Sequence, residues 1–288
     1  MRLILHTSDI DSLRSRALDA DVARFRAVRP SGITLPALLE LVCSSWMWSH
    51  SAGEVFNPIV DGWSQNLPDL RRARNLLATA VDPQKKPAPF DAPIKELWRI
   101  KSRRDWADDP ASLFQARFRR SLEKHGFGKK LSLALSKAMQ EMADNIIQHS
   151  GSDEEHSAVG LVGYHVEEHW MTYAVADIGR GVLATLETNP KWSTLSGSGD
   201  ALRAAIYQCA SRRVSSPFGT GFSEVQKSLA DLNGTLRFRS GNACLTLVGH
   251  RAARQATLST NPYLVGFQLA VTCCRAVDSS IRALPNRD

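Results

Sequence analysis

The clearest periodic pattern in the chain spans residues 131–149, where apolar residues recur at steps of three and four. This is the period of an α-helix with one buried face, so we expect a helix over this segment. Its predicted core positions are Leu131, Leu135, Ala138, Met142 and Ile146.

A second face of the same helix carries Glu141, Asn145 and His149 at i, i+4 and i+8. Residues four apart stack along one side of a helix, so these three can reach a single ligand. The amide oxygen of Asn145 suits the octahedral shell of Mg²⁺, and the carboxylate of Glu141 can accept a proton from an attacking water. Taken alone, the pattern is more often the solvated face of an amphipathic helix.

Strand patterns follow the helix. Two runs of apolar and aromatic residues, 157–166 and 170–176, are separated by a polar turn over 167–169. The second run leads directly into Asp177-Ile-Gly-Arg-Gly181. We therefore expect two neighbouring strands, the second ending at an aspartate and a glycine-rich turn.

The remaining pattern predicts one more helix and further strands. A helix is expected to begin near Phe218-Gly-Thr-Gly-Phe222 and to end at a C-cap at Asn233-Gly234. After it we expect a hairpin of strands 235–240 and 243–248 around a turn at Gly241-Asn242. A loop over 250–261 and a closing strand over 264–273 complete the prediction.

The order of these motifs resembles the GHKL superfamily of ATP-binding proteins, also called the Bergerat fold, over residues 115–275. The superfamily includes histidine kinases, DNA gyrase B subunits, heat-shock chaperones and mismatch-repair ATPases. Its N box, E-x-x-x-N, corresponds to Glu141 and Asn145. His149 stands where the sigma-factor-regulating serine kinases of the superfamily often have a histidine.

Two glycine motifs extend the resemblance. The first, D-x-G-x-G, corresponds to Asp177, Gly179 and Gly181, and the second, G-x-G before a helix, corresponds to Gly219 and Gly221. An aspartate at a strand end can accept a hydrogen bond from the amino group of adenine, and glycines allow the backbone to approach the base and sugar.

Phosphate binding is expected at the second glycine motif. The segment Gly219, Thr220, Gly221 and Phe222 would present free backbone N–H groups at a helix start, where the helix dipole favours phosphate. No G-x-x-x-x-G-K-[ST] run is present, so we do not expect a P-loop. A tight turn is the structural alternative for each glycine pair.

The resemblance also implies an ATP lid over residues 182–218. Within it, 193–200 is rich in Ser and Gly, and 201–210 is typical of a short helix. Arg212 and Arg213 follow, and on a lid they could contact the γ-phosphate of ATP. A solvated basic turn is the more common role for such a pair.

One position departs from the superfamily. In many members the closing strand carries Gly-Thr, and the threonine helps to hold the adenine-binding aspartate. Here Gly266 is followed by Phe267, so that contact is absent or is supplied by another group.

The expected fold class is α+β, a two-layer α/β sandwich. Its mixed, mostly antiparallel sheet would be covered by helices on one face. We expect three regions: a mainly helical N-terminal region over 1–110, the GHKL-type domain over 111–275 and a tail over 276–288. The segment 82–93 holds four prolines in twelve residues, which marks a linker or boundary.

The composition and charge of the chain indicate what kind of protein it is. The chain has 288 residues, 43% hydrophobic, with a net charge of +7, which fits a globular protein with a large core. No apolar run reaches the length of a membrane span, and we expect a cytoplasmic protein. Residues 101–130 hold nine Lys/Arg against four Asp/Glu. Such a basic segment can bind an acidic protein or nucleic acid, or can simply be solvated. Because the chain has no nucleic-acid motif, nucleic acid is not favoured as the partner.

The resulting hypothesis is a Mg-ATP-binding protein of the GHKL class that hydrolyses ATP or transfers its γ-phosphate to a partner protein. Glu141 would be the base, Asn145 would hold Mg²⁺ and Asp177 would bind adenine. Lid closure would switch a protein interaction made through the N-terminal region. Self-phosphorylation is not expected, because His50 and His125 lack the sequence context of a phosphoaccepting histidine.

Two alternatives remain. The chain could be a non-catalytic interaction module that uses nucleotide as a structural ligand. It could also be a nucleic-acid-linked ATPase, although we do not expect, after residue 275, the second domain that supplies a catalytic lysine in the mismatch-repair branch. The oligomeric state stays open, with a homodimer as one option.

Overall fold

The computed structural model describes residues 3–18, 25, 28–47, 51–78, 95–100, 106, 109–149, 160–208, 229, 233–249 and 256–275. The chain divides into two compact units between Lys86 and Pro87. This division falls inside the proline-rich segment 82–93 and earlier than the boundary at residue 110 expected from the sequence.

The first unit is mainly helical in its described part. Apolar residues including Leu13, Leu38, Trp63 and Leu70 are almost fully buried in it. Its elements are β1 (Ile4–Leu5), α1 (Thr7–Leu18), β2 (Gly32–Ile33), α3 (Leu35–Met47), α4 (Ser51–Asn66) and α5 (Pro68–Ala78), with β1 and β2 paired in parallel.

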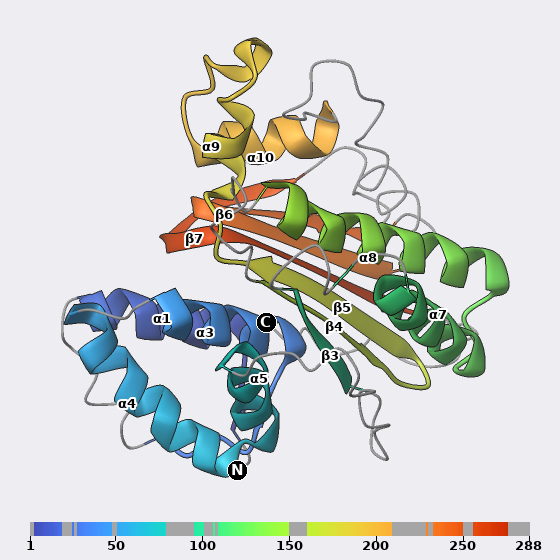
Figure 1. The fold of residues 1–288 in the computed structure, drawn as a ribbon, viewed down its shortest axis with the longest axis horizontal. Coiled ribbons are helices and arrows are strands. Elements are labelled where there is room, and N and C mark those ends of the chain that lie inside the picture. Colours follow the sequence, from blue (N-terminus) through green and yellow to red (C-terminus); the bar gives the residue numbers. More distant parts are fainter. Residues whose placement is uncertain are drawn as a thin grey trace. The chain divides into compact units, whose positions relative to one another are not determined.

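The second unit is built on a sheet in the order β3-β4-β5-β7-β6 (Figure 1). All of its neighbouring strands pair antiparallel, so the described sheet is antiparallel throughout rather than mixed. Its strands are β3 (Lys95–Ile100), β4 (Gly160–Val166), β5 (Trp170–Asp177), β6 (Asn233–Val248) and β7 (Thr257–Cys274).

Two helices, α7 (Asp109–Lys124) and α8 (Lys129–His149), lie over one face of this sheet (Figure 1). Every second residue of β5, namely Met171, Tyr173 and Val175, packs into the core that the sheet shares with these helices. The predicted apolar face of α8 is confirmed: Leu131 packs against this core, and Leu135, Ala138, Met142 and Ile146 are buried in it. The observed class is α+β with helices on one sheet face.

After β5 the chain forms α9 (Gly181–Leu186), the 3₁₀ turn η1 (Pro190–Trp192) and α10 (Ser198–Tyr207), beside the ends of β6 and β7 (Figure 1). Leu202, Ala205 and Ile206 of α10 belong to the main core. The predicted helix is present here, but the described part of the expected lid segment is packed against the sheet. Its Ser- and Gly-rich stretch forms the approach to α10 and its first turn.

The predicted hairpin at Gly241-Asn242 is wrong. Residues 235–240 and 243–248 belong to one strand, β6, which pairs with β7 along both halves. The register shifts at Ser240/Gly241 and at Gly241/Ala243, and Gly241 has φ +59°. The glycine therefore serves a β-bulge, which needs the same left-handed conformation as a tight turn.

Two smaller predictions in this region are also wrong. Residues 257–261, expected in a loop, form the first part of β7. Gly234, expected at a helix C-cap, lies in β6 opposite Cys273 and has no left-handed φ. A Cβ there would stand 2.5 Å from Leu229 Cδ2, so close packing explains the glycine. The helix predicted to begin near residues 218–222 and to end at Asn233-Gly234 lies almost entirely outside the described residues.

None of the helices in the described ranges is both long enough and apolar enough to cross a lipid bilayer.

Candidate functional site

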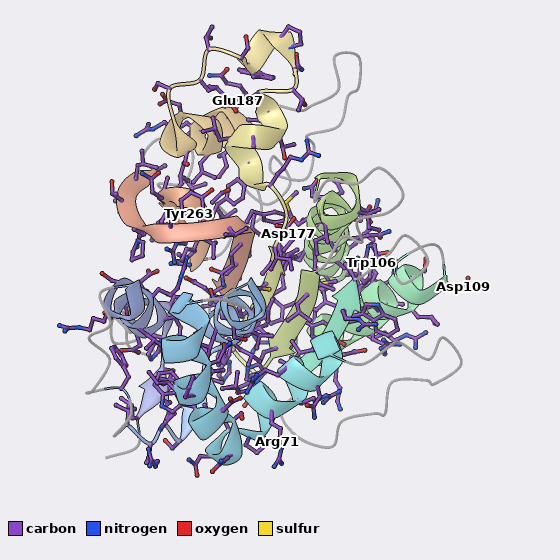
Figure 2. All side chains as sticks on the ribbon, turned by 60° about the vertical axis from the view of Figure 1, so that its left-hand side comes forward. Arg71, Trp106, Asp109, Asp177, Glu187 and Tyr263 are labelled. Atoms are coloured by element: carbon purple, nitrogen blue, oxygen red, sulfur yellow. The ribbon has the colours of Figure 1, made fainter. Side chains whose placement is uncertain are left out.

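Asp177 is the last residue of β5, where the strand passes into the segment of α9 (Figure 2). Successive strand residues point to opposite faces. Because Met171, Tyr173 and Val175 face α7 and α8, Asp177 continues on the same face. Its partner across the β4–β5 ladder is Gly160.

The carboxylate of Asp177 is held by backbone groups. Its Oδ1 accepts hydrogen bonds from the N–H of Phe267 over 2.9 Å and from the N–H of Gly179 over 3.2 Å. Oδ2 receives no hydrogen bond from the described residues. The side chain is 2% exposed, and burial raises its pKa to about 7 although the two hydrogen bonds lower it. One oxygen is therefore fixed, while the described residues leave the other without a hydrogen bond.

Gly266 permits this arrangement. It has φ +73°, and a Cβ there would stand 2.2 Å from the carbonyl oxygen of Asp177 and 2.3 Å from its Oδ1. The residue after this glycine holds the aspartate, because Phe267 donates its backbone N–H to Oδ1 of Asp177. The backbone N–H of Phe267 thus supplies the support for Asp177 that the sequence, with no threonine after Gly266, left unassigned.

The glycine turn after Asp177 is fixed at its far end by Ser240. The Ser240 Oγ accepts from the N–H of Val182 over 2.9 Å and donates to the carbonyl of Gly266 over 2.7 Å. Gly181 has φ +81°, and a Cβ there would stand 2.8 Å from this hydroxyl. The turn is thus clamped between β6 and β7.

Helix α8 reaches the same end of the sheet. A Cβ on Gly160 would stand 2.7 Å from Cδ1 of Ile146 and 2.9 Å from its Cγ2. Opposite residues in an antiparallel ladder lie about 5 Å apart, so Ile146 covers the position beside Asp177. Asn145 immediately precedes Ile146 in the chain, so its backbone lies at this end of the sheet.

Glu141 lies one helical turn before Asn145, and its charge acts on Tyr173. The pKa of Tyr173 is raised by burial first, then by the Cys273 thiol and by the charge of Glu141. The Tyr173 hydroxyl is buried and has no hydrogen-bond partner among the described residues. The order Glu141 to Ile146 along α8 therefore runs in the same direction as Tyr173 to Asp177 along β5.

Asn145 is suited to a metal role. It is partly buried, and its Nδ2 contacts Met142 Sδ at 3.8 Å, while the described residues give its Oδ1 no hydrogen bond. In those same ranges no cluster of three or more His, Cys, Asp or Glu side chains could hold a metal ion. Mg²⁺ is usually bound through one or two protein oxygens together with substrate phosphates, so a single amide fits that pattern.

Several predicted site residues cannot be placed. Gly219, Thr220, Gly221 and Phe222, together with Arg212 and Arg213, lie outside the described residues. The backbone of His149 belongs to the last turn of α8, but its side chain is not among those described. Of the predicted site, the structure therefore describes Asp177 with its glycine turn and the side chains of Glu141 and Asn145 on α8.

The sequence pattern missed a contact next to the N box. Trp106 donates from its indole Nε1 to Oδ1 of Asp144 over 2.8 Å, and the indole is 2% exposed. Burial raises the pKa of Asp144, and the Trp106 hydrogen bond opposes this rise. Figure 2 shows Trp106 beside α8. In the sequence, the only sign of this contact is that Asp144 stands next to Asn145.

Comparison with known proteins found no matching family model, no matching curated protein and no matching solved structure.

Proposed function

We propose that the protein binds ATP with Mg²⁺ as a GHKL-class nucleotide-binding domain, and that it hydrolyses ATP or transfers its γ-phosphate to a partner protein. The observation that carries the proposal is the state of Asp177. Its buried carboxylate is fixed through Oδ1 by Phe267 and Gly179 and keeps Oδ2 for a ligand. It stands beside a glycine turn and faces the helix that carries Glu141 and Asn145.

Adenine fits this carboxylate better than guanine does. The exocyclic amino group of adenine donates hydrogen bonds, whereas guanine presents a carbonyl oxygen at the equivalent position. A buried acceptor placed against another acceptor loses its hydrogen bond and repels its neighbour. The site is therefore expected to select ATP over GTP through Asp177.

The N-box residues supply the phosphate chemistry in this proposal. The Oδ1 of Asn145 would hold Mg²⁺, which neutralises phosphate charge when it is bound. Glu141 would accept the proton of the attacking group, a water in hydrolysis or a serine hydroxyl of a partner in transfer. Glu141 and Asn145 lie one helical turn apart on α8, so one side of this helix would carry both roles.

A protein partner is part of the proposal. The N-terminal helical unit is the expected partner-binding region. The α7–α8 turn adds a basic surface, since the side chains of Arg119, Arg120, Lys124, Lys129 and Lys130 are exposed. Such a surface favours an acidic protein segment as the partner.

A non-catalytic nucleotide-binding module is the second candidate. The packing of α10 favours it, because Leu202, Ala205 and Ile206 anchor much of the expected lid segment in the core. A lid with that anchor has less freedom to close on each turnover. Nucleotide would then act as a structural ligand.

The test is an incubation of purified protein with γ-labelled ATP and Mg²⁺, preceded by equilibrium dialysis against ATP, ADP and GTP. The proposal expects saturable ATP binding, weaker GTP binding and release of labelled phosphate or its transfer to an added partner. Tight ADP binding without turnover would favour the non-catalytic module. The absence of adenine-nucleotide binding at millimolar concentration would refute both.

A further inference from the structure

Ser240 lies at the bulge in β6, and its single hydroxyl joins three elements. It donates to the carbonyl oxygen of Gly266 in β7 over 2.7 Å and accepts from the N–H of Val182 in α9 over 2.9 Å. The side chain is 3% exposed, so water competes little for these bonds. Both contacts are made to residues that border the Asp177 turn.

The contact with Val182 replaces a missing helix cap. The first N–H groups of an α-helix have no partner within the helix and are commonly satisfied by the side chain of the N-cap residue. The N-cap of α9, Arg180, makes no side-chain cap hydrogen bond. Ser240, 58 residues later in the chain, supplies the acceptor.

The surrounding glycines leave room for this hydroxyl. A Cβ on Gly181 would stand 2.8 Å from Ser240 Oγ and 3.1 Å from the carbonyl oxygen of Gly266. Gly181 and Gly266 both have positive φ, which only glycine adopts without strain. The turn after Asp177 is therefore fixed at its start by Phe267 and at its end by Ser240.

We propose that Ser240 is a positioning residue for adenine binding: it holds the 177–182 turn in the conformation that presents Asp177 and Gly179 to the base. This inference rests on the proposed nucleotide-binding function and adds a residue that no sequence motif indicates. Ser240 does not touch the ligand. It keeps the turn ordered before the ligand binds. The free-energy cost of ordering the turn on binding is therefore smaller, and the affinity is higher.

Removal of the hydroxyl has a specific expected effect. In Ser240→Ala, the Val182 N–H and the Gly266 carbonyl lose a buried partner, and the turn relaxes. The affinities for adenosine and for ATP should then fall by the same factor, about tenfold, because the substitution affects only the contacts with the base. Amide hydrogen exchange at Val182 should become faster in the ligand-free protein.

The variants are chosen to separate positioning from general stability. Ser132→Ala is the matched control, because Ser132 is fully buried and its Oγ donates to the Phe127 carbonyl over 3.2 Å. It lies near the start of α8, about 20 Å along the helix from Asn145. Ser132→Ala should leave adenosine affinity unchanged. Ser240→Thr keeps a hydroxyl, so it should retain most of the adenosine affinity that Ser240→Ala loses.

The deciding experiment is calorimetric titration of adenosine and ATP into the wild type, Ser240→Ala, Ser240→Cys, Ser240→Thr and Ser132→Ala. Ser240→Cys keeps the connectivity of the side chain but replaces the hydroxyl by a larger thiol that is a weaker donor and acceptor, so it provides the readout should Ser240→Ala fail to fold. Wild-type affinity in both Ser240→Ala and Ser240→Cys, or a loss confined to ATP, would overturn the inference. A wild-type protein that binds neither ligand would instead refute the proposed function.

Discussion

The backbone N–H of Phe267 donates to Oδ1 of Asp177 over 2.9 Å and thereby fixes the carboxylate at the end of β5. The two residues are 90 positions apart in the chain and meet because β7 lies beside β5 in the sheet. Among single substitutions, only a change to proline removes a main-chain donor. The geometry of the site at this point therefore depends on the backbone of β7, and Gly266 is the position through which it can be disturbed.

Gly266→Ala should destabilise the protein and abolish adenine-nucleotide binding. The new Cβ would stand 2.2 Å from the Asp177 carbonyl oxygen at a residue with φ +73°. Strain of this kind costs on the order of 1–3 kcal/mol before any repacking. Urea unfolding measures it, with Gly128→Ala as the control, because a Cβ at Gly128 meets no atom within 4 Å. A Gly266→Ala protein with unchanged stability and binding would contradict the described packing.

Adenosine affinity should fall as the pH drops below about 7. Burial raises the pKa of Asp177 from 3.8 to about 7, and the adenine amino group needs the ionised carboxylate as its acceptor. Above that pH the carboxylate is present; below it, a proton must leave before binding, which costs about tenfold in affinity per pH unit. Adenosine is the suitable probe because it carries no titrating phosphate. An affinity that is flat between pH 8 and 5.5 would argue against this role of Asp177.

Glu141→Gln should remove turnover while ATP still binds. The carboxamide keeps the shape of the side chain but cannot take a proton, and loss of a general base typically lowers the rate by a factor of about 100 or more. Glu123→Gln on α7 is the control acid outside the site. Phosphate release in single-turnover mixtures measures the step. Equal, measurable rates in Glu141→Gln and wild type would remove the catalytic role of Glu141, and no phosphate release from either protein would favour the non-catalytic module.

Trp106→Phe should cost more stability than Trp170→Phe. Each indole donates to a carboxylate over 2.8 Å, Trp106 to Asp144 and Trp170 to Glu167. The first bond involves a fully buried indole, whereas the Glu167 side chain is 42% exposed and can replace its partner with water. We expect about 1–3 kcal/mol for Trp106 and under about 1 kcal/mol for Trp170. Equal losses in denaturant unfolding would show that burial does not govern these bonds.

Three local elements of the second unit, namely α8, β4 and β5, followed from the sequence. The period of 131–149 gave both the helix and its buried face, since Leu135 and Ile146 are fully buried. The strands 160–166 and 170–177 were also anticipated, together with the placement of Asp177 at a strand end. These features depend on residues close together in the chain, which is why periodicity predicts them.

Features that depend on distant segments did not follow from the sequence. Gly241 gives the same local signal for a tight turn and for a β-bulge, and only pairing with β7 decides between them. The support of Asp177 comes from the main chain of Phe267 and the turn is closed by Ser240. Neither residue type signals such a role, because a backbone N–H carries no sequence information and a serine in a strand is common.

Calorimetric titration of ATP with Mg²⁺ into the wild type, Asp177→Asn and Glu168→Gln tests the central claim most directly. Asp177→Asn keeps the side-chain volume but removes the anionic acceptor, and Glu168 is an exposed acid, 83% accessible, in the turn between β4 and β5. The account predicts saturable binding to the wild type and to Glu168→Gln, and binding at least tenfold weaker in Asp177→Asn. Equal affinity in all three proteins, or no binding to the wild type, would contradict it.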